Sequence, residues 1–254
     1  MDDRPVGVLD SGIGGLSVLK AALDELPRES FVYIADDKNM PYGEKTSAQI
    51  KKYVFECARF LLDRQAKAIV IACNTATSAA VEDVRRELRL PVVSIEPAIK
   101  PALERTTGTV LMLATHGTCA LERYQSLKRR LDTDGRVIDV PCPELASRVE
   151  RGDFSPDAFD DLFDEYITEY VNKHPEAVVL GCTHYPFVKP QLAAWFARHG
   201  CRVQFFAGAA GTARQLARVL EKNGLESAAA ERRVELFSTS GENRQEIMRK
   251  LLFN

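Results

Sequence analysis

The sequence predicts an α/β protein with two pseudo-symmetric, doubly wound domains, each built on a parallel sheet. Short apolar runs alternate with amphipathic helical patterns along the whole chain, and this alternation is typical of parallel α/β architecture. A strand-to-helix pattern also occurs twice, as AIVIACNTATS at 68–78 and AVVLGCTHYPF at 177–187. The 254 residues suffice for one to two domains of about 150 residues each.

The expected strands are bounded by turn residues and are rich in Val, Ile and Leu. They lie at 6–9, 31–35, 68–72, 92–95, 109–113, 137–140, 177–180, 203–206 and 234–237. A helix is predicted over 47–65, where Thr46 and Gln49 have the spacing of a capping box. A second helix is predicted over 189–199, ending at Gly200 as a C′ glycine.

Composition excludes several classes of protein. The 34 basic and 36 acidic residues leave a net charge of −2, so the sequence does not support a nucleic-acid-binding surface. No run approaches 18 apolar residues, and the acidic start lacks the apolar core of a signal peptide. We therefore expect a cytoplasmic protein with no membrane partner. The six cysteines include no Cys-x-x-Cys pair, which argues against a zinc ribbon, and disulfides are not expected in that compartment.

Polar clusters follow several predicted strands, where ligands bind in open α/β sheets. The first contains Gly12, Gly14 and Ser17 in the pattern G-x-G-x-x-S, and Asp36 follows the second strand. A dinucleotide fingerprint needs a third glycine at the serine position. A turn that requires flexible glycine explains this segment equally well.

The two cysteine clusters carry the stronger chemical signal. Cys73 and Cys182 each end a buried strand just before a helix, where the helix dipole and backbone N–H groups favour a thiolate. In extended backbone, Cys182 and His184 would share a face, so His184 is expected to hold a proton for the thiol. Backbone amides, hydroxyls and the Asn74 amide nearby offer neutral donors for a carboxylate. Two facing domains would place both thiols in one cleft.

Two equivalent thiols in one cleft suit a racemase better than a hydrolase. A cysteine hydrolase uses one thiol, one base and an oxyanion hole. Cofactor-independent racemisation instead needs a base on one face of Cα and an acid on the other. A single-thiol hydrolase and a non-catalytic protein that binds a nucleotide or an amino acid remain the alternatives from other classes.

These motifs resemble glutamate racemases, within the aspartate/glutamate racemase superfamily. The matching segments are GVLDSGIGGLSVL (7–19), YIADDKNMPYGEKT (33–46), IACNTAT (71–77), EPAIKPA (96–102), CPELASRVERG (142–152) and LGCTHYPF (180–187). The resemblance implies a two-base isomerase that needs no cofactor or metal. Its small-molecule substrate would be glutamate, and it would supply D-glutamate for peptidoglycan synthesis. It also implies one domain formed by 1–97 plus 208–254 and a second formed by 98–207.

The resemblance also implies roles for individual residues. Cys73 and Cys182 match the catalytic acid/bases, with Asp10 near the first thiol and His184 near the second. The positions that match the substrate site are Asp10, Ser11, Pro41, Tyr42, Gly43, Asn74, Thr75, Thr118, Thr183 and His184. Asp36 and Glu150 align with further acids of the family, without an assigned role.

Aspartate is shorter than glutamate by one methylene, a difference worth only about 1–3 kcal/mol in a pocket. The choice between these two substrates therefore rests on a single sequence position. Relatives that act on aspartate usually have His where this chain has Thr77, which favours glutamate and leaves an aspartate racemase as the near alternative. The sequence departs from many members at 206–215. It lacks the N-terminal extension that some relatives use for activation by a cell-wall precursor, so no such activation is expected. Homodimers are common in the family, although the sequence reveals no interface.

Overall fold

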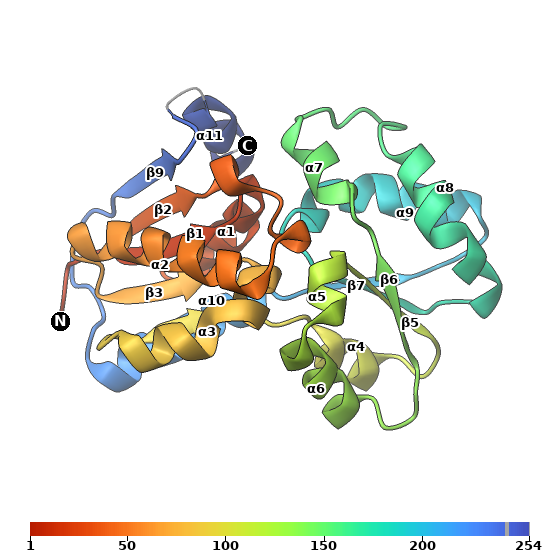
Figure 1. Ribbon diagram of the computed structural model, residues 1–254, viewed down its shortest axis with the longest axis horizontal. Helices are drawn as coiled ribbons and strands as arrows, with labels where there is room; N and C mark the ends of the chain where they lie inside the picture. Colours follow the sequence, from red (N-terminus) through yellow and green to blue (C-terminus); the bar gives the residue numbers. More distant parts are fainter. Residues whose placement is uncertain (242–243, 254) are drawn as a thin grey trace.

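The chain forms two α/β halves that lie side by side, each around its own parallel sheet (Figure 1). The computed structural model describes residues 1–241 and 244–253. The first sheet has the strand order β4-β3-β1-β2-β9 and the second the order β6-β5-β7-β8. The strands are β1 Val6–Asp10, β2 Phe31–Ala35, β3 Ala68–Ile71, β4 Val92–Ser94, β5 Val110–Ala114, β6 Val137–Pro141, β7 Ala177–Leu180, β8 Gln204–Ala207 and β9 Val234–Ser238.

Every strand predicted from the sequence is present, with ends displaced by at most one residue. All neighbouring strands are parallel. The central strands are buried on both faces, which is why they read as continuous apolar runs rather than alternating ones. The predicted fold class is therefore confirmed.

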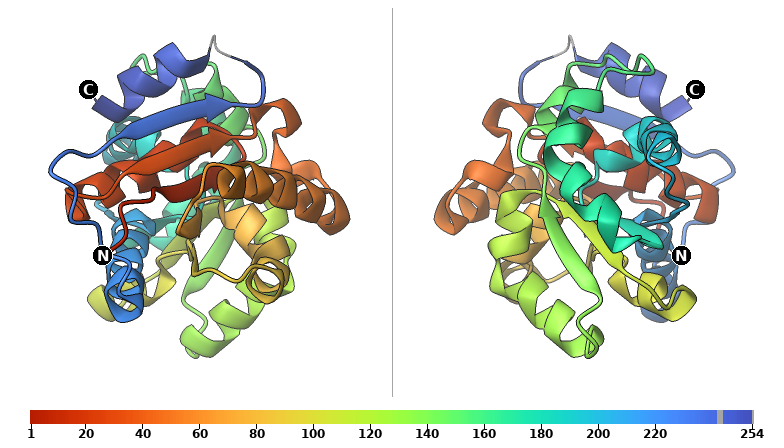
Figure 2. Two further views of the ribbon diagram at one scale, coloured as in Figure 1. Left: turned by 90° about the vertical axis from the view of Figure 1, so that its left-hand side faces the viewer. Right: turned by 90° about the vertical axis from the view of Figure 1, so that its right-hand side faces the viewer.

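Helices cover both faces of each sheet (Figure 2). The α-helices are α1 Leu16–Glu25, α2 Ser47–Asp63, α3 Asn74–Glu87, α4 Ile99–Arg105, α5 His116–Ala120, α6 Glu122–Leu131, α7 Leu145–Glu150, α8 Asp160–Ile167, α9 Lys189–Arg198, α10 Ala209–Asn223 and α11 Gln245–Phe253. Short 3₁₀ helices lie at η1 Ile13–Gly15, η2 Asp37–Asn39, η3 Tyr42–Glu44, η4 Thr168–Lys173 and η5 Tyr185–Val188.

The first sheet separates two apolar cores. On one face, Leu19 of α1 packs in the same cluster as Leu216 of α10 and Met248 of α11. On the other face, α2 and α3 bury Val54 and Val81. These helices hold the carboxyl ends of β1 and β3 in fixed positions, and both strands lead into the site described below.

Helix boundaries follow local sequence signals. Thr46 and Gln49 form the predicted capping box at the start of α2, with each side chain bonded to the other residue's backbone N–H. The second predicted helix is α9, and Gly200 after it has a φ of +71°. A left-handed residue at this position suits glycine, so both helix predictions are confirmed.

The chain passes between the two sheets twice, at residues 95–98 and 207–208. The two passages touch: a Cβ on Gly208 would lie 2.5 Å from the carbonyl oxygen of Glu96. Glycine is required there because the two backbones approach too closely for a side chain. After the first passage α4 packs on the second sheet, and after the second α10 packs on α1.

Within the described residues, no helix combines the length and apolar character needed to cross a membrane.

Candidate active site

The site lies where both sheets reverse their strand order. From β1 the chain adds β2 on one side and β3 on the other, and from β5 it adds β6 and then β7 in the same way. Ligands bind at such switch points, beyond the carboxyl ends of the strands. Cys73 follows β3 and Cys182 follows β7, and both thiols line a single cavity of about 20 Å³.

The cavity is lined by ten of the residues that the sequence singled out: Ser11, Pro41, Tyr42, Gly43, Cys73, Asn74, Thr75, Thr118, Cys182 and His184. Met40, Thr115 and Ala146 complete the lining. Asp10 and Thr183 lie behind this wall and are bonded to each other. The structure thus brings together residues from both copies of the repeated strand-to-helix segment, 68–78 and 177–187.

Cys73 is the N-cap residue of α3, and its sulfur accepts two hydrogen bonds. The donors are the backbone N–H of Ala76 at 3.4 Å and the hydroxyl of Ser11 at 3.5 Å. Burial, together with the nearby charge of Asp10, nevertheless raises the pKa of Cys73 to about 12. The helix start and Ser11 lower the pKa of this thiol, as the sequence predicts, but desolvation outweighs them and the net shift favours the thiol form.

Asp10 ends β1 and is buried between the two halves of the protein. Its carboxylate accepts hydrogen bonds from the backbone N–H of Gly12 at 2.9 Å and the hydroxyl of Thr183 at 3.1 Å. Burial raises the pKa of Asp10 to about 6, although the charge of His184 opposes the shift. Asp10 therefore titrates close to neutral pH.

Cys182 and His184 are in direct contact. The thiol sulfur lies 3.6 Å from Nδ1 of His184. The predicted contact is present, but its geometric reason was wrong: the backbone turns after β7, and His184 has helical dihedral angles. The ring reaches back to the sulfur from within this turn.

Glu150 fixes the other side of the imidazole. Its Oε1 lies 2.8 Å from Nε2 of His184 and also accepts the backbone N–H of Ile13 at 2.7 Å. Burial opposes the imidazolium, yet hydrogen bonds to Cys182 and Glu150 outweigh it and raise the pKa of His184 well above its usual value. The pKa of Glu150 is lowered because His184, Ile13 and Arg244 together outweigh its burial.

The glycine-rich turn after β1 serves the contact between the two halves. A Cβ on Gly14 would lie 2.5 Å from Nδ1 of His184 and 2.6 Å from Oγ1 of Thr183. Glycine at this position lets the turn approach the segment that follows Cys182. Neither Gly12 nor Gly14 has a positive φ, so close packing on the other half, rather than a turn that needs flexible glycine, explains these glycines.

Three threonine hydroxyls form a polar cluster in the wall of the cavity. The Oγ1 atoms of Thr75, Thr115 and Thr118 lie 3.0 Å from one another, each pair in hydrogen-bonding contact. Thr115 was missed in the sequence analysis, although it directly follows β5 and caps α5 through the N–H of Thr118. Its position at the end of a central strand was the available signal.

The segment around Pro41–Gly43 closes another side of the cavity. The hydroxyl of Tyr42 donates to Asp36 at 2.6 Å, and Asp36 also accepts from Asn39 and Thr239. Asp36 thus holds this segment in place rather than facing the cavity. A Cβ on Gly43 would lie 2.9 Å from the Cβ of Thr115, so the segment packs tightly on the second half.

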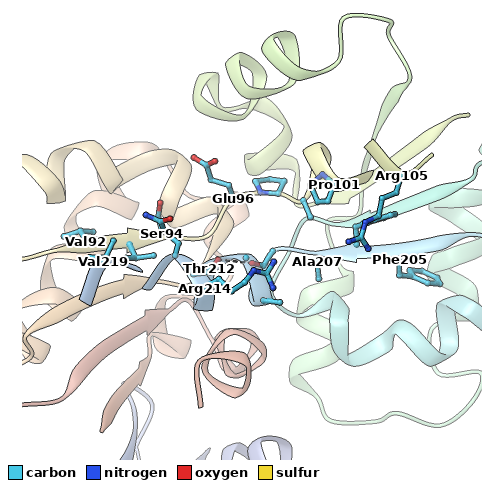
Figure 3. A pocket seen from close by; sticks show the side chains of 18 of the residues that line it. Val92, Ser94, Glu96, Pro101, Arg105, Phe205, Ala207, Thr212, Arg214 and Val219 are labelled. Carbon is cyan, nitrogen blue, oxygen red and sulfur yellow. Dashed lines mark hydrogen bonds between the residues drawn. The ribbon is translucent and has the colours of Figure 1, made fainter. Parts of the chain in front are cut away.

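A larger cavity of about 700 Å³ lies beside the two passages between the sheets (Figure 3). Its lining includes Ser94, Glu96, Arg105 and Arg214, and neither thiol belongs to it. Both thiols therefore belong to the smaller cavity. Within the described ranges 1–241 and 244–253, no cluster of three or more His, Cys, Asp or Glu side chains is placed to hold a metal ion.

Comparisons with known proteins agree with this geometry. Residues 15–216 match the family model described as Asp/Glu/Hydantoin racemase. A glutamate racemase of Clostridium perfringens (strain 13 / Type A) is 41% identical over 229 residues, which are 89% of this chain and 87% of that protein.

Two solved structures are also similar along the whole chain. The glutamate racemase of Francisella tularensis in complex with D-glutamate has a TM-score of 0.85 at 29% identity, covering 100% of this chain and 95% of that one. The enzyme of Thermus thermophilus in complex with beta-chloro-D-alanine has a TM-score of 0.83 at 36% identity, with the same coverage. The chain therefore belongs to the Asp/Glu/Hydantoin racemase family of isomerases.

Proposed function

We propose that this protein interconverts L-glutamate and D-glutamate by a two-cysteine, two-base mechanism without a cofactor. The observation that carries the proposal is that Cys73 and Cys182, which follow strands of different sheets, line the same small cavity. Each thiol has its own supporting groups, Ser11 and Asp10 for the first and His184 and Glu150 for the second. A hydrolase with one thiol would leave one of these two assemblies unused.

The proposed reaction moves one proton in each direction. A thiolate removes the Cα proton of the bound amino acid, and the electron pair remains on a carbanion conjugated with the α-carboxylate. The opposite thiol then donates its proton to the other face of Cα and becomes a thiolate. Burial favours the thiol form of Cys73. Nδ1 of His184 lies 3.6 Å from the sulfur of Cys182, so the imidazole is placed to exchange a proton with this thiol.

The cavity wall can hold the substrate mainly through neutral donors. The cluster Thr75, Thr115 and Thr118, together with Ser11, offers hydroxyl groups for the two carboxylates. Oδ1 of Asn74 is buried and has no hydrogen-bond partner among the described residues. That oxygen is free to accept a hydrogen bond from the substrate ammonium.

Substrate entry requires the two halves to separate. A cavity of about 20 Å³ has room for roughly one water molecule, and glutamate is several times larger. Closing the halves over the substrate would exclude water from the carbanion. The passages at residues 95–98 and 207–208 are the natural hinges, since the chain connects the sheets there.

We propose glutamate rather than aspartate as the substrate, because both solved relatives and the curated relative named above are glutamate racemases. Thr77, the position that suggested glutamate in the sequence, is buried and bonds the carbonyl of Ile71 at 3.4 Å. It is not part of the cavity wall, so it would affect specificity only indirectly, by positioning α3, whose first residues line the cavity.

The wider role follows from the proposed activity. D-glutamate made by this protein would enter peptidoglycan synthesis, and the cytoplasm is the compartment we propose for it. The domains would comprise 1–97 plus 208–254 and 98–207, in keeping with the sheet to which each strand belongs. A homodimer stays a prediction.

The experiment is racemisation in D₂O. Purified, reduced protein without added cofactor is incubated with L-glutamate, and with L-aspartate in parallel. Optical rotation and the Cα proton signal are followed. Loss of rotation with deuterium at Cα of glutamate supports the proposal. Turnover of aspartate alone would keep the chemistry and overturn the substrate, and exchange of neither would refute the racemase assignment.

A further inference from the structure

A chain of charged contacts continues beyond the acid/base groups to the C-terminal segment. Arg244 immediately precedes α11, in the half of the protein that carries Cys73. Its guanidinium forms an ion pair with Oε2 of Glu150, which ends α7 in the other half. The helices α11 and α7 lie on facing sides of the two halves (Figure 1). The sequence analysis gave no indication of Arg244, because none of the recognised motifs includes it.

The contact is specific in its geometry. Arg244 also donates to the backbone carbonyl oxygen of Glu150 at 3.3 Å, and its Nε lies 3.0 Å from Oδ2 of Asp37. The carboxylate of Asp37 is itself held by Ser238 at 2.9 Å and by the backbone N–H of Ser240 at 3.1 Å. The guanidinium is therefore fixed at one end by the first half and presents its other end to Glu150.

The two oxygens of Glu150 have different partners. Oε1 serves His184 and Ile13, whereas Oε2 faces Arg244. The Glu150 side chain is 5% exposed, so without Arg244 half of a buried carboxylate would lose its partner. A carboxylate that shifts or takes up a proton no longer holds His184 in its charged form.

We infer that Arg244 is a positioning residue for the Cys182 half of the reaction, acting through Glu150 and His184. It touches neither thiol and does not line the cavity. This inference rests on the proposed two-thiol racemisation. It adds that a residue from one half of the protein, when the halves are closed, sets the protonation of the acid/base group in the other half.

The test replaces Arg244 and measures isotope effects from each enantiomer. For Arg244→Gln we expect kcat/KM to fall about tenfold, equivalent to about 1.4 kcal/mol at the transition state. The equilibrium constant of racemisation is unity, so this fall must be equal in the two directions. The substrate isotope effect on kcat/KM, measured with [2-²H]-L- and [2-²H]-D-glutamate, is not bound by that equality.

The expected signature is a pair of opposite shifts. If proton transfer at Cys182 becomes slower, the isotope effect rises for the enantiomer that Cys182 deprotonates and falls for the one that Cys73 deprotonates. Arg244→Lys, which keeps the charge, should recover part of the rate. Asp37→Asn loosens Arg244 from its other partner and should give the same pattern more weakly, which keeps the test informative if an Arg244 variant folds poorly.

Arg123 provides the matched control. Its side chain is 28% exposed against 29% for Arg244, and it too joins the two halves, through Glu82 of α3 and Glu96. It has no contact with His184 or Glu150. Arg123→Gln should leave both isotope effects unchanged.

Equal or absent changes in the two isotope effects of Arg244→Gln, or the same pattern in Arg123→Gln, would overturn the inference. Failure of the proposed function is distinguishable, because the unaltered protein would then not racemise glutamate at all.

Discussion

The hydroxyl of Thr183 donates a hydrogen bond to Asp10 across the boundary between the two halves, at 3.1 Å. Asp10 ends β1 next to Ser11, whose hydroxyl donates to the first thiol, and Thr183 stands between Cys182 and His184. The segments that carry the two thiols are therefore connected behind the cavity wall as well as across it. A change in the charge of Asp10 therefore affects both Cys73 and His184.

Asp10 should make the stability of the protein depend on pH. Its pKa is about 6 in the folded protein against 3.8 as a reference. Below about pH 3 the carboxyl is protonated in both states, and as the pH rises the unfolded state ionises first, which favours unfolding. Asp10→Asn should therefore gain stability relative to the unaltered protein by about 2 kcal/mol between pH 4 and pH 7. Urea unfolding of both proteins at the two pH values measures this, and a pH-independent difference would contradict it.

Thr115 should contribute to substrate binding through its hydroxyl. Thr115→Val removes one member of the cluster with Thr75 and Thr118. We expect KM for glutamate to rise about fivefold, since a neutral hydrogen bond contributes about 1 kcal/mol. The variant also loses the cap of α5, so Thr115→Ser, which keeps both the cap and the cluster, is the control. Steady-state kinetics test this; an unchanged KM in the valine variant would exclude the hydroxyl from the binding site.

Gly208 and Gly211 should respond to alanine in opposite directions. A Cβ on Gly208 would press against the carbonyl of Glu96, whereas nothing lies within 4 Å of a Cβ on Gly211. Gly208→Ala should destabilise the protein by about 1–3 kcal/mol through overpacking between the two passages. Gly211→Ala, inside α10, should stabilise it by about 0.5–1 kcal/mol through helix propensity. Thermal unfolding of the two variants provides the comparison, and a stabilised Gly208→Ala would mean that the passages are not in contact.

The fold could be predicted because its signals are local. Buried runs such as AIVI at 68–71 specify parallel strands, and Thr46 with Gln49 specifies a helix start. The recurring cysteine segments also predicted the shared cavity. The charged groups around His184 could not be predicted in the same way. Glu150 reaches His184 from a separate helix of the same half, and Arg244, which pairs with Glu150, comes from the other half.

The ionisation of Cys73 could not be predicted from sequence either. The helix start and the Ser11 hydroxyl stabilise a thiolate, as expected, but the degree of burial and the neighbouring Asp10 decide the outcome. The burial depends on how the two halves pack, and Asp10 lies close to Cys73 because β1 pairs with β3. The sequence identifies the reactive group, whereas its pKa is a property of the assembled site.

The requirement for both thiols is the central claim, and Cys73→Ser and Cys182→Ser test it most directly. Serine keeps the shape of each site but is a far weaker acid, so each variant should lose racemisation of glutamate by about 10²–10⁴-fold, the range of general acid–base catalysis. Cys201→Ser is the control, since Cys201 packs with α9 away from the cavity and should keep full activity. If either of the first two variants racemises glutamate at a rate near that of the control, the two-base mechanism is contradicted.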